Sequence, residues 1–367
     1  MNKISLLSLT LVLILLVTAC QSTGAPVADA TETKPTALPN TLPEIDTYTP
    51  VPYAKGKVFL DNILSGGVPL DGIPAIETPK FITMEEAKGL YKDDDQFFIT
   101  TLDGQVYLYP QSILVWHEIV NMTDHNVSVT YCPLTGSCIT FQQPDHLATS
   151  FGTSGNLLNS NLVMYDRATG TNISQIDGVG LDNDLEGYVL DTIPTYWIDF
   201  ATAKASFDQA LVLSEVTGFL RNYTSDPYGS YTEDRASNYY TSKGVMFPLL
   251  NTDESYNFHD KQMVIGIKHQ GSHGAVIKST IPKDGVLNFT LDGTPMTAVY
   301  DPLINNTRVF IGTYALVETG TLVDEADQQW RTDGSSIGTE ATLDSPNHFE
   351  VMWFAWYAFY PDTEVIE

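Results

Sequence analysis

Residues 127–136 read VSVTYCPLTG, and this stretch decides the fold class of the 367-residue chain. Apolar and polar side chains alternate through its first five residues, which is typical of a strand with one buried face. A turn follows, because Pro133 fixes φ and Gly136 accepts a positive φ. The same alternation recurs at 105–109 and 287–291. We therefore predict a mainly β protein.

A few short helices are expected among the strands. Residues 83–86, TMEE, form a capping box that opens one helix. Residues 196–207 and 351–360 have helical patterns, and Pro361 stops the second of them.

Two parts of the chain resemble each other. YCPL at 131–134 corresponds to YDPL at 300–303. We predict a diverged tandem duplication of a β-rich unit, and chance similarity between strands is the alternative. Residues present in only one copy are then the better candidates for chemistry, and Cys132 stands where the second copy has Asp301.

The chain divides into six segments on this prediction. They are a lipoprotein signal peptide at 1–20, a flexible tether at 21–45, an N-terminal lead-in at 46–79, a first β-rich repeat carrying the candidate site at 80–215, a linking segment rich in Tyr, Ser and Asp at 216–249, and a second β-rich repeat at 250–367. About 320 residues follow the tether, a length that fits one large domain or two moderate ones.

The first twenty residues indicate export. Lys3 gives a positive start, and 6–17 is an apolar run that is too short for a comfortable membrane span. The run ends in VTAC at 17–20, which is typical of a lipobox, while an ordinary signal peptide containing a cysteine is the alternative. We predict cleavage before Cys20 and lipidation of this residue. The protein would then be extracytoplasmic and anchored to a membrane of the cell envelope.

Composition narrows the choice of partners. The chain has 18 basic and 45 acidic residues and a net charge of −27 at pH 7. Such a surface repels phosphate backbones, so we expect no nucleic-acid partner. Glycans, cations, cell-wall material and basic envelope proteins remain open, and solubility alone would also explain the charge.

His117 and Cys132 are the centre of the candidate site. If 112–122 is helical, His117 and Asn121 are four residues apart and share one face. Imidazole suits a metal ligand or a general base, and the alternative is a partly buried histidine bonded to backbone. Asn121 or Asn159 would orient the catalytic groups.

Cys132 begins a turn that presents its side chain at a strand end. The thiol would be a nucleophile if His117 lowers its pKa, or a soft ligand for copper or zinc with His117 beside it. A metal needs further ligands, and Glu118, Asp166 and His125 are candidates. The alternative is a structural disulfide with Cys138, which an exported location permits.

A third cluster is polar. Asn159 and Asn161, together with Glu118, Asp166 and Arg167, would line a small-ligand pocket. The alternative is a turn rich in side-chain to backbone hydrogen bonds followed by an Asp/Arg pair.

Four stretches carry a family resemblance: WHEIVN at 116–121, YCPLTG at 131–136, NSNLVMYDR at 159–167 and PYG at 227–229. Together they resemble the prokaryotic family catalogued as domain of unknown function 3179, from about residue 73 to the C-terminus. The chain departs from that pattern at Thr135, where many members have a second cysteine, and at Ile173, where many have tryptophan. The first departure weakens a metal or redox site built on a CxxC pair. The resemblance implies the fold class and a candidate site, but no reaction.

The leading hypothesis is a lipid-anchored envelope protein of unknown activity. It places a metal or small-ligand pocket around His117 and Cys132, with thiol-dependent catalysis as a variant, and leaves open whether the protein is an enzyme. The alternative is a non-catalytic surface or assembly module with a structural Cys132–Cys138 disulfide.

Overall fold

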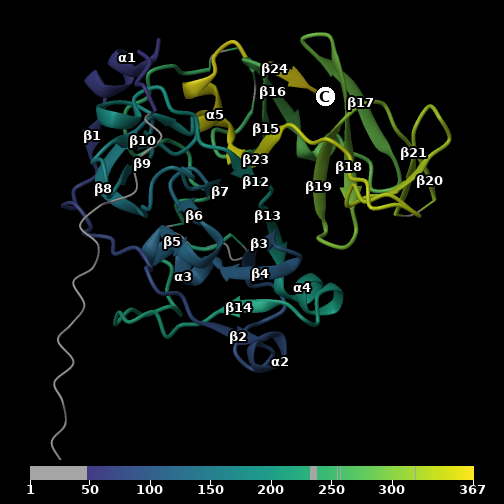
Figure 1. Ribbon diagram of the computed structural model, residues 1–367, viewed down its shortest axis with the longest axis horizontal. Coiled ribbons are helices and arrows are strands. Elements are labelled where there is room, and N and C mark those ends of the chain that lie inside the picture. Colours follow the sequence, from purple (N-terminus) through teal and green to yellow (C-terminus); the bar gives the residue numbers. More distant parts are fainter. Residues whose placement is uncertain (1–47, 232–237, 254, 257, 319) are drawn as a thin grey trace, which may run out of the picture. The chain divides into compact units, whose positions relative to one another are not determined.

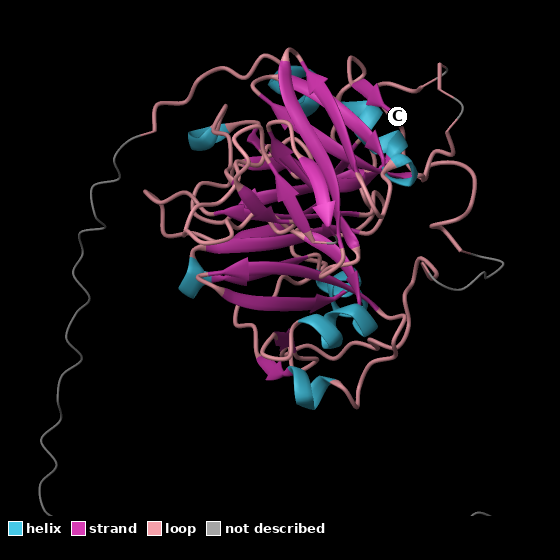
Figure 2. Ribbon diagram, turned by 90° about the vertical axis from the view of Figure 1, so that its right-hand side faces the viewer, coloured by secondary structure: helices cyan, strands magenta, loops and turns pink. Residues whose placement is uncertain are grey.

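Strands make up most of the regular structure, as the alternating segments predict. The computed structural model describes residues 48–231, 238–253, 255–256, 258–318 and 320–367. Within these ranges the chain forms 24 strands and five short α-helices (Figure 2), which confirms a mainly β fold with a few short helices. Residues from Ile45 to Glu367 form one compact unit. The predicted signal peptide and tether lie outside the described residues, and none of the described helices is long and apolar enough to cross a bilayer.

The first half contains a five-stranded sheet, from which the chain continues directly into the helix that precedes the candidate site (Figure 1). Its order is β13 (Tyr196–Asp199), β3 (Gln96–Leu102), β4 (Gln105–Pro110), β14 (Leu211–Leu213) and β2 (Phe81–Thr83). The pairing is antiparallel except between β4 and β14. Helix α2 (Met84–Ala87) begins at the predicted capping box, and α4 (Phe200–Ser206) follows β13.

The second half repeats the same arrangement. Its sheet has the order β23 (Asn347–Met352), β15 (Met263–His269), β16 (Ser272–Ile277) and β24 (Glu364–Ile366), and only the β16–β24 pair is parallel. Helix α5 (Trp353–Phe359) follows β23 as α4 follows β13. This is the correspondence that a duplication would leave, and the duplication itself stays a prediction.

The remaining strands form four further sheets. Two lie in the first half. One has the order β12 (Thr192–Ile193), β7 (Ser137–Gln142), β6 (Val127–Cys132), β5 (Ile119–Met122). The other has the order β1 (Leu64–Ser65), β8 (Phe151–Leu158), β9 (Asn161–Asp166), β10 (Asn172–Ser174), β11 (Val179–Gly180). Two lie in the second half: β17 (Val286–Leu291), β18 (Thr294–Asp301), β19 (Asn306–Ile311) and β20 (Ala315–Glu318), β21 (Thr321–Val323), β22 (Gln329–Arg331). The other helical segments are α1 (Gly56–Asp61), α3 (Gln111–His117) and the 3₁₀ turns at Thr123–His125, Asn183–Leu185 and Lys278–Thr280.

Three predicted helices begin or end elsewhere than expected. The segments 196–199 and 347–352 are strands, so α4 and α5 each begin only after a strand has ended. The helix expected over 112–122 stops at His117, and 119–122 forms β5 instead. This segment pairs with β6 instead of continuing the helix, because the pairing gives hydrogen bonds to the backbone groups of a fully buried segment. His117 and Asn121 therefore do not share a helix face.

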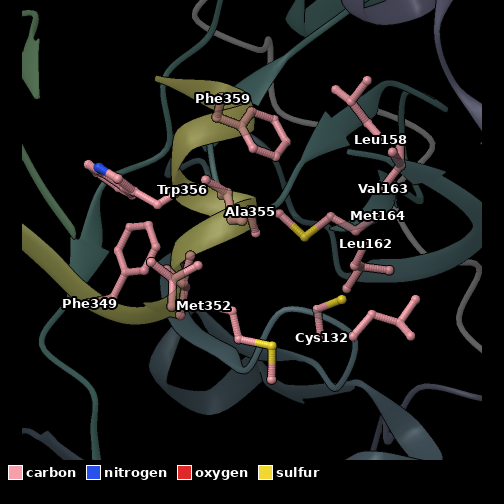
Figure 3. Close-up of a cluster of buried hydrophobic side chains, with 14 of the residues drawn as sticks. Cys132, Leu158, Leu162, Val163, Met164, Phe349, Met352, Ala355, Trp356 and Phe359 are labelled. Carbon is pink, nitrogen blue, oxygen red and sulfur yellow. The ribbon is translucent and has the colours of Figure 1, made fainter. Parts of the chain in front are cut away.

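The largest core cluster contains side chains from both halves. Helix α5 contributes Trp356 and Phe359, and the β8–β9 hairpin contributes Leu158 and Leu162. Figure 3 shows these side chains together with Cys132, which lies at the end of β6 beside Leu162 in the same cluster. The strand end that carries the thiol is thus fixed by packing from both halves of the chain.

Candidate functional site

The β6–β7 hairpin sends its two cysteines to opposite faces. Cys132 is opposite Ser137 in the ladder, and Cys138 is opposite Tyr131. Successive side chains alternate in direction, so Cys132 packs in the cluster with α5, whereas Cys138 packs in a different one. Both thiols are free. A bridge would need a one-residue change of register, so the geometry speaks against the disulfide alternative.

Glu118 ends helix α3 in a left-handed conformation. Its φ is 57°, its N–H donates to the carbonyl oxygen of Leu114 at 2.7 Å, and its own carbonyl accepts from Tyr131 N–H at 2.7 Å. The residue is only 8% exposed. None of the described residues donates a hydrogen bond to its carboxylate, and burial raises its pKa to about 8.

The Cys132 thiol is buried. The residue is 1% exposed, and its Sγ lies 3.8 Å from the carbonyl oxygen of Ser160. Burial first, and then the charge of Glu118, raise the pKa of Cys132 to about 11. The hydroxyl of Thr135 bonds to the carbonyl oxygen of Cys132 at 3.5 Å and to Ser137 Oγ at 2.8 Å.

Tyr228, in the linking segment, packs against the core cluster that contains Cys132. Burial raises the pKa of its hydroxyl, and the charges of Glu118 and Cys132 raise it further. The backbone holds Tyr228 in position: its N–H donates to Oδ1 of Asp226 at 2.7 Å, and its carbonyl accepts from Tyr239 N–H at 2.7 Å. We call Glu118, Cys132 and Tyr228 the acid–thiol site.

His117 lies outside the acid–thiol site. Its Nδ1–H donates to the carbonyl oxygen of Pro74 at 2.7 Å, and its Nε2 accepts from the Tyr223 hydroxyl at 2.7 Å. Burial lowers its pKa and keeps the ring neutral. Both ring nitrogens are engaged, which fits the alternative of a buried histidine bonded to backbone. His117 anchors the chain immediately before Glu118.

The predicted metal pair does not fit this geometry. A ligating histidine offers a free ring nitrogen, and His117 has none. In the part of the chain that the structure describes, no group of three or more His, Cys, Asp or Glu side chains is placed to hold a metal ion. A copper or zinc ion held by His117 and Cys132 is therefore unsupported.

The asparagines act within the fold. Asn121 on β5 accepts from Ser128 Oγ at 2.6 Å and donates to the carbonyl oxygen of Phe151 at 2.9 Å. Asn161 donates to Oε1 of Gln175 at 2.7 Å, and Asn159 accepts from Leu250 N–H at 2.8 Å. These amides join strands and loops, and none of them bonds to the thiol.

Asp166 and Arg167 are also engaged away from Cys132. Asp166 caps its own turn by accepting from Thr169 N–H at 2.7 Å, as the turn alternative expected. Arg167 pairs with Asp71 at 2.7 Å and with Glu77 at 3.1 Å. Of the predicted site residues, Asn121 and Arg167 both bond to Glu77, each at 3.1 Å, and the charge of Glu118 acts on the pKa of Cys132.

Sequence reasoning missed the part played by Tyr228. The signal was present, because three of the stretches that carry the family resemblance each supply one member of the acid–thiol site. These stretches are WHEIVN, YCPLTG and PYG. Their separation along the chain hid the meeting, which depends on long-range packing.

The fold and the site define a mainly β protein with a buried acid–thiol site at a hairpin end. The chain belongs to the family described as "Protein of unknown function (DUF3179)", whose model matches residues 70–363. No curated protein and no solved structure matches the chain.

Proposed function

We propose that this is a lipid-anchored protein of the cell envelope whose folded part holds a small, uncharged ligand at the acid–thiol site, with Cys132 as the reactive group. The observation that carries the proposal is Glu118: its carboxylate is buried and lacks a hydrogen-bond donor among the described residues, and its charge raises the pKa of the Cys132 thiol.

Glu118 destabilises the folded protein in two ways, through its backbone conformation and through its buried carboxylate. A residue that does so is expected to serve a function. A left-handed backbone costs a non-glycine residue about 1–2 kcal/mol. Burial also raises the pKa of the Glu118 carboxylate to about 8, so the folded protein loses stability when this carboxylate ionises. Strained backbone and shifted pKa values both concentrate at functional sites, and here they coincide in one residue.

The surroundings indicate the ligand class. Tyrosines 228 and 239 wall the site, and their rings lie 6.0 Å apart in an edge-on contact. The acidic chain repels anions. A small neutral molecule with a hydrogen-bonding group fits these conditions.

Native thiol labelling tests the site. The full chain carrying Cys20→Ser retains only Cys132 and Cys138, and we would treat it with iodoacetamide or with a bulky polyethylene-glycol maleimide. Mass spectrometry should find one iodoacetamide adduct, on Cys132, and slow reaction with the bulky reagent. Cys132→Ser and Cys138→Ser variants assign the adduct. If Cys132 reacts only after denaturation, no small ligand reaches it and the proposed site is lost.

The anchor is tested separately in cells. We expect the wild-type chain to incorporate labelled fatty acid and to fractionate with membranes, because lipidation of Cys20 would supply the attachment. Cys20→Ser should abolish both properties. Label that persists in Cys20→Ser, or that never enters the wild-type chain, contradicts the lipoprotein prediction.

A further inference from the structure

We infer that a second site of this protein, a cavity walled by residues within 90–97, by Gln111 and by the linking segment, binds a small organic ammonium ion. The cavity has a volume of about 280 Å³, which suits a small ligand. None of Glu118, Cys132 and Tyr228 lines it, so the inference goes beyond the proposed function and does not depend on it.

Negative charge dominates the wall of this cavity. Its ionisable side chains other than tyrosine are four carboxylates and one amine: Asp94, Asp95, Glu215, Asp226 and Lys92. None of the four carboxylates forms an ion pair with a described residue. A cation in the cavity would therefore meet carboxylates that are not neutralised, whereas an anion would be repelled.

Gln111 contributes a buried acceptor that has no donor. The residue is 8% exposed and lines the cavity. Its Nε2 donates to Oδ2 of Asp226 at 2.9 Å and lies 3.3 Å from the Tyr131 hydroxyl and 3.4 Å from the Tyr240 hydroxyl. Its Oε1 accepts no hydrogen bond from a described residue and is not fully enclosed, so it is open to the cavity. A buried carbonyl oxygen without a donor is costly, and a primary ammonium group supplies three N–H donors.

Tyr91 gives a second observation of the same kind. It lines the cavity, and its hydroxyl oxygen is buried with no hydrogen-bond partner among the described residues. Its ring lies 4.9 Å from that of Phe97, which lines the cavity as well. Two tyrosines of the linking segment, Tyr223 and Tyr231, complete the aromatic part of the wall. Aromatic rings attract a cation and also pack against a short carbon chain.

The arrangement suits an organic cation better than a metal ion. Across the described ranges, no group of three or more His, Cys, Asp or Glu side chains is placed to hold a metal. The carboxylates are therefore spread around the wall instead of converging on one point. A short alkyl chain with a primary ammonium group at each end suits such a wall, because each end can bond to a carboxylate or to Gln111 while the methylenes pack on the rings.

Isothermal titration calorimetry with 1,4-diaminobutane tests the site on the full chain carrying Cys20→Ser, at physiological ionic strength so that weak surface attraction is screened. We expect saturable binding of one molecule per chain. Glu215→Gln and Tyr91→Phe should each weaken the affinity at least threefold, because the first removes a carboxylate and the second a hydroxyl acceptor. Neither side chain makes a hydrogen bond to a described residue, so both variants should fold, which circular dichroism checks.

Glu340→Gln is the matched control, because it removes an exposed carboxylate that does not line the cavity. It should leave the affinity unchanged. Equal weakening by Glu340→Gln and Glu215→Gln would show that the diamine responds only to the net charge of the chain, and this result overturns the site. A parent that shows no saturable binding overturns it as well.

Two further probes test the class of ligand. The fully N-methylated analogue of the diamine keeps both charges but has no N–H donor, so it should bind at least tenfold more weakly. Calcium chloride at the same concentration as the diamine should not displace it. Equal affinity for the methylated analogue overturns the ammonium assignment, and displacement by calcium overturns the choice of an organic cation. The proposed function stands in each case, because labelling of Cys132 tests the acid–thiol site alone.

Discussion

Glu118 and His117 are neighbours in the chain but lie in different environments. The side chain of His117 meets Pro74 and Tyr223, whereas that of Glu118 is buried without a hydrogen bond among the described residues. The left-handed φ at Glu118 separates them, because it ends the helix between the two residues. A sequence motif that contains both residues indicates a site but does not tell which of them belongs to it.

Glu118 should make stability depend on pH. Its pKa is raised from 4.5 to about 8 on folding, so its contribution is complete below pH 4.5 and is lost as the pH rises through 8. Glu118→Gln removes this loss. Since each unit of pKa shift corresponds to about 1.4 kcal/mol, the free energy of unfolding at pH 9 should be several kcal/mol higher in the variant than in the parent. Urea midpoints at pH 5 and pH 9 measure the effect. The exposed Glu364→Gln is the control, and parallel midpoints for Glu118→Gln and parent would contradict the assignment.

The matching hairpins of the two halves differ at the site. Asp301 at the end of β18 forms an ion pair with Arg308 at 2.7 Å, and the carboxylate is fully buried. The same positions in the β6–β7 hairpin hold Cys132 and Ile139, since both hairpins have the same register and loop length. The second half thus uses its strand end for a structural pair, and the first leaves a thiol there. This contrast fits the expectation that residues present in one copy only carry the chemistry.

Helix α5 approaches β15 closely at Gly266. A Cβ atom built on Gly266 would lie 2.3 Å from Cε3 of Trp356, so the helix would have to move. Gly266→Ala should therefore lower the free energy of unfolding by about 1–3 kcal/mol. Gly89→Ala is the matched control, because nothing lies within 4 Å of its added Cβ. Equal denaturation midpoints for the two variants would show that α5 does not pack this tightly.

The largest hydrophobic core of the molecule contains residues from both halves of the chain. Phe359 of α5 lies in the same cluster as Phe151 of β8 and Cys132 of β6. The hydrogen bond from Met352 N–H to the carbonyl oxygen of Thr135, at 2.8 Å, also joins the halves. The sequence-based repeats at 80–215 and 250–367 are therefore packed into one unit, so loss of packing in one half should also destabilise the other.

Phe359→Ala tests this coupling. The substitution should cost about 3–5 kcal/mol, because it leaves a cavity in the shared core. Hydrogen–deuterium exchange should then accelerate in β3 and β4 as well as in β15 and β16, since both halves open together. Val317→Ala, at an exposed position of β20, should change neither. Acceleration confined to residues 250–367 would mean that the halves open independently.

The sequence by itself determined the strand content, the turns and the two stretches that hold Glu118 and Cys132. These features are local, because side-chain alternation and turn residues act over a few positions. Only the tertiary structure decided that both ring nitrogens of His117 bond elsewhere, that Cys138 points away from Cys132, and that Tyr228 packs against the cluster that contains Cys132. The direction of a side chain follows from backbone angles and from strand register, and a partner such as Tyr223 for His117 comes from a segment 106 residues away. A local pattern does not encode these relations.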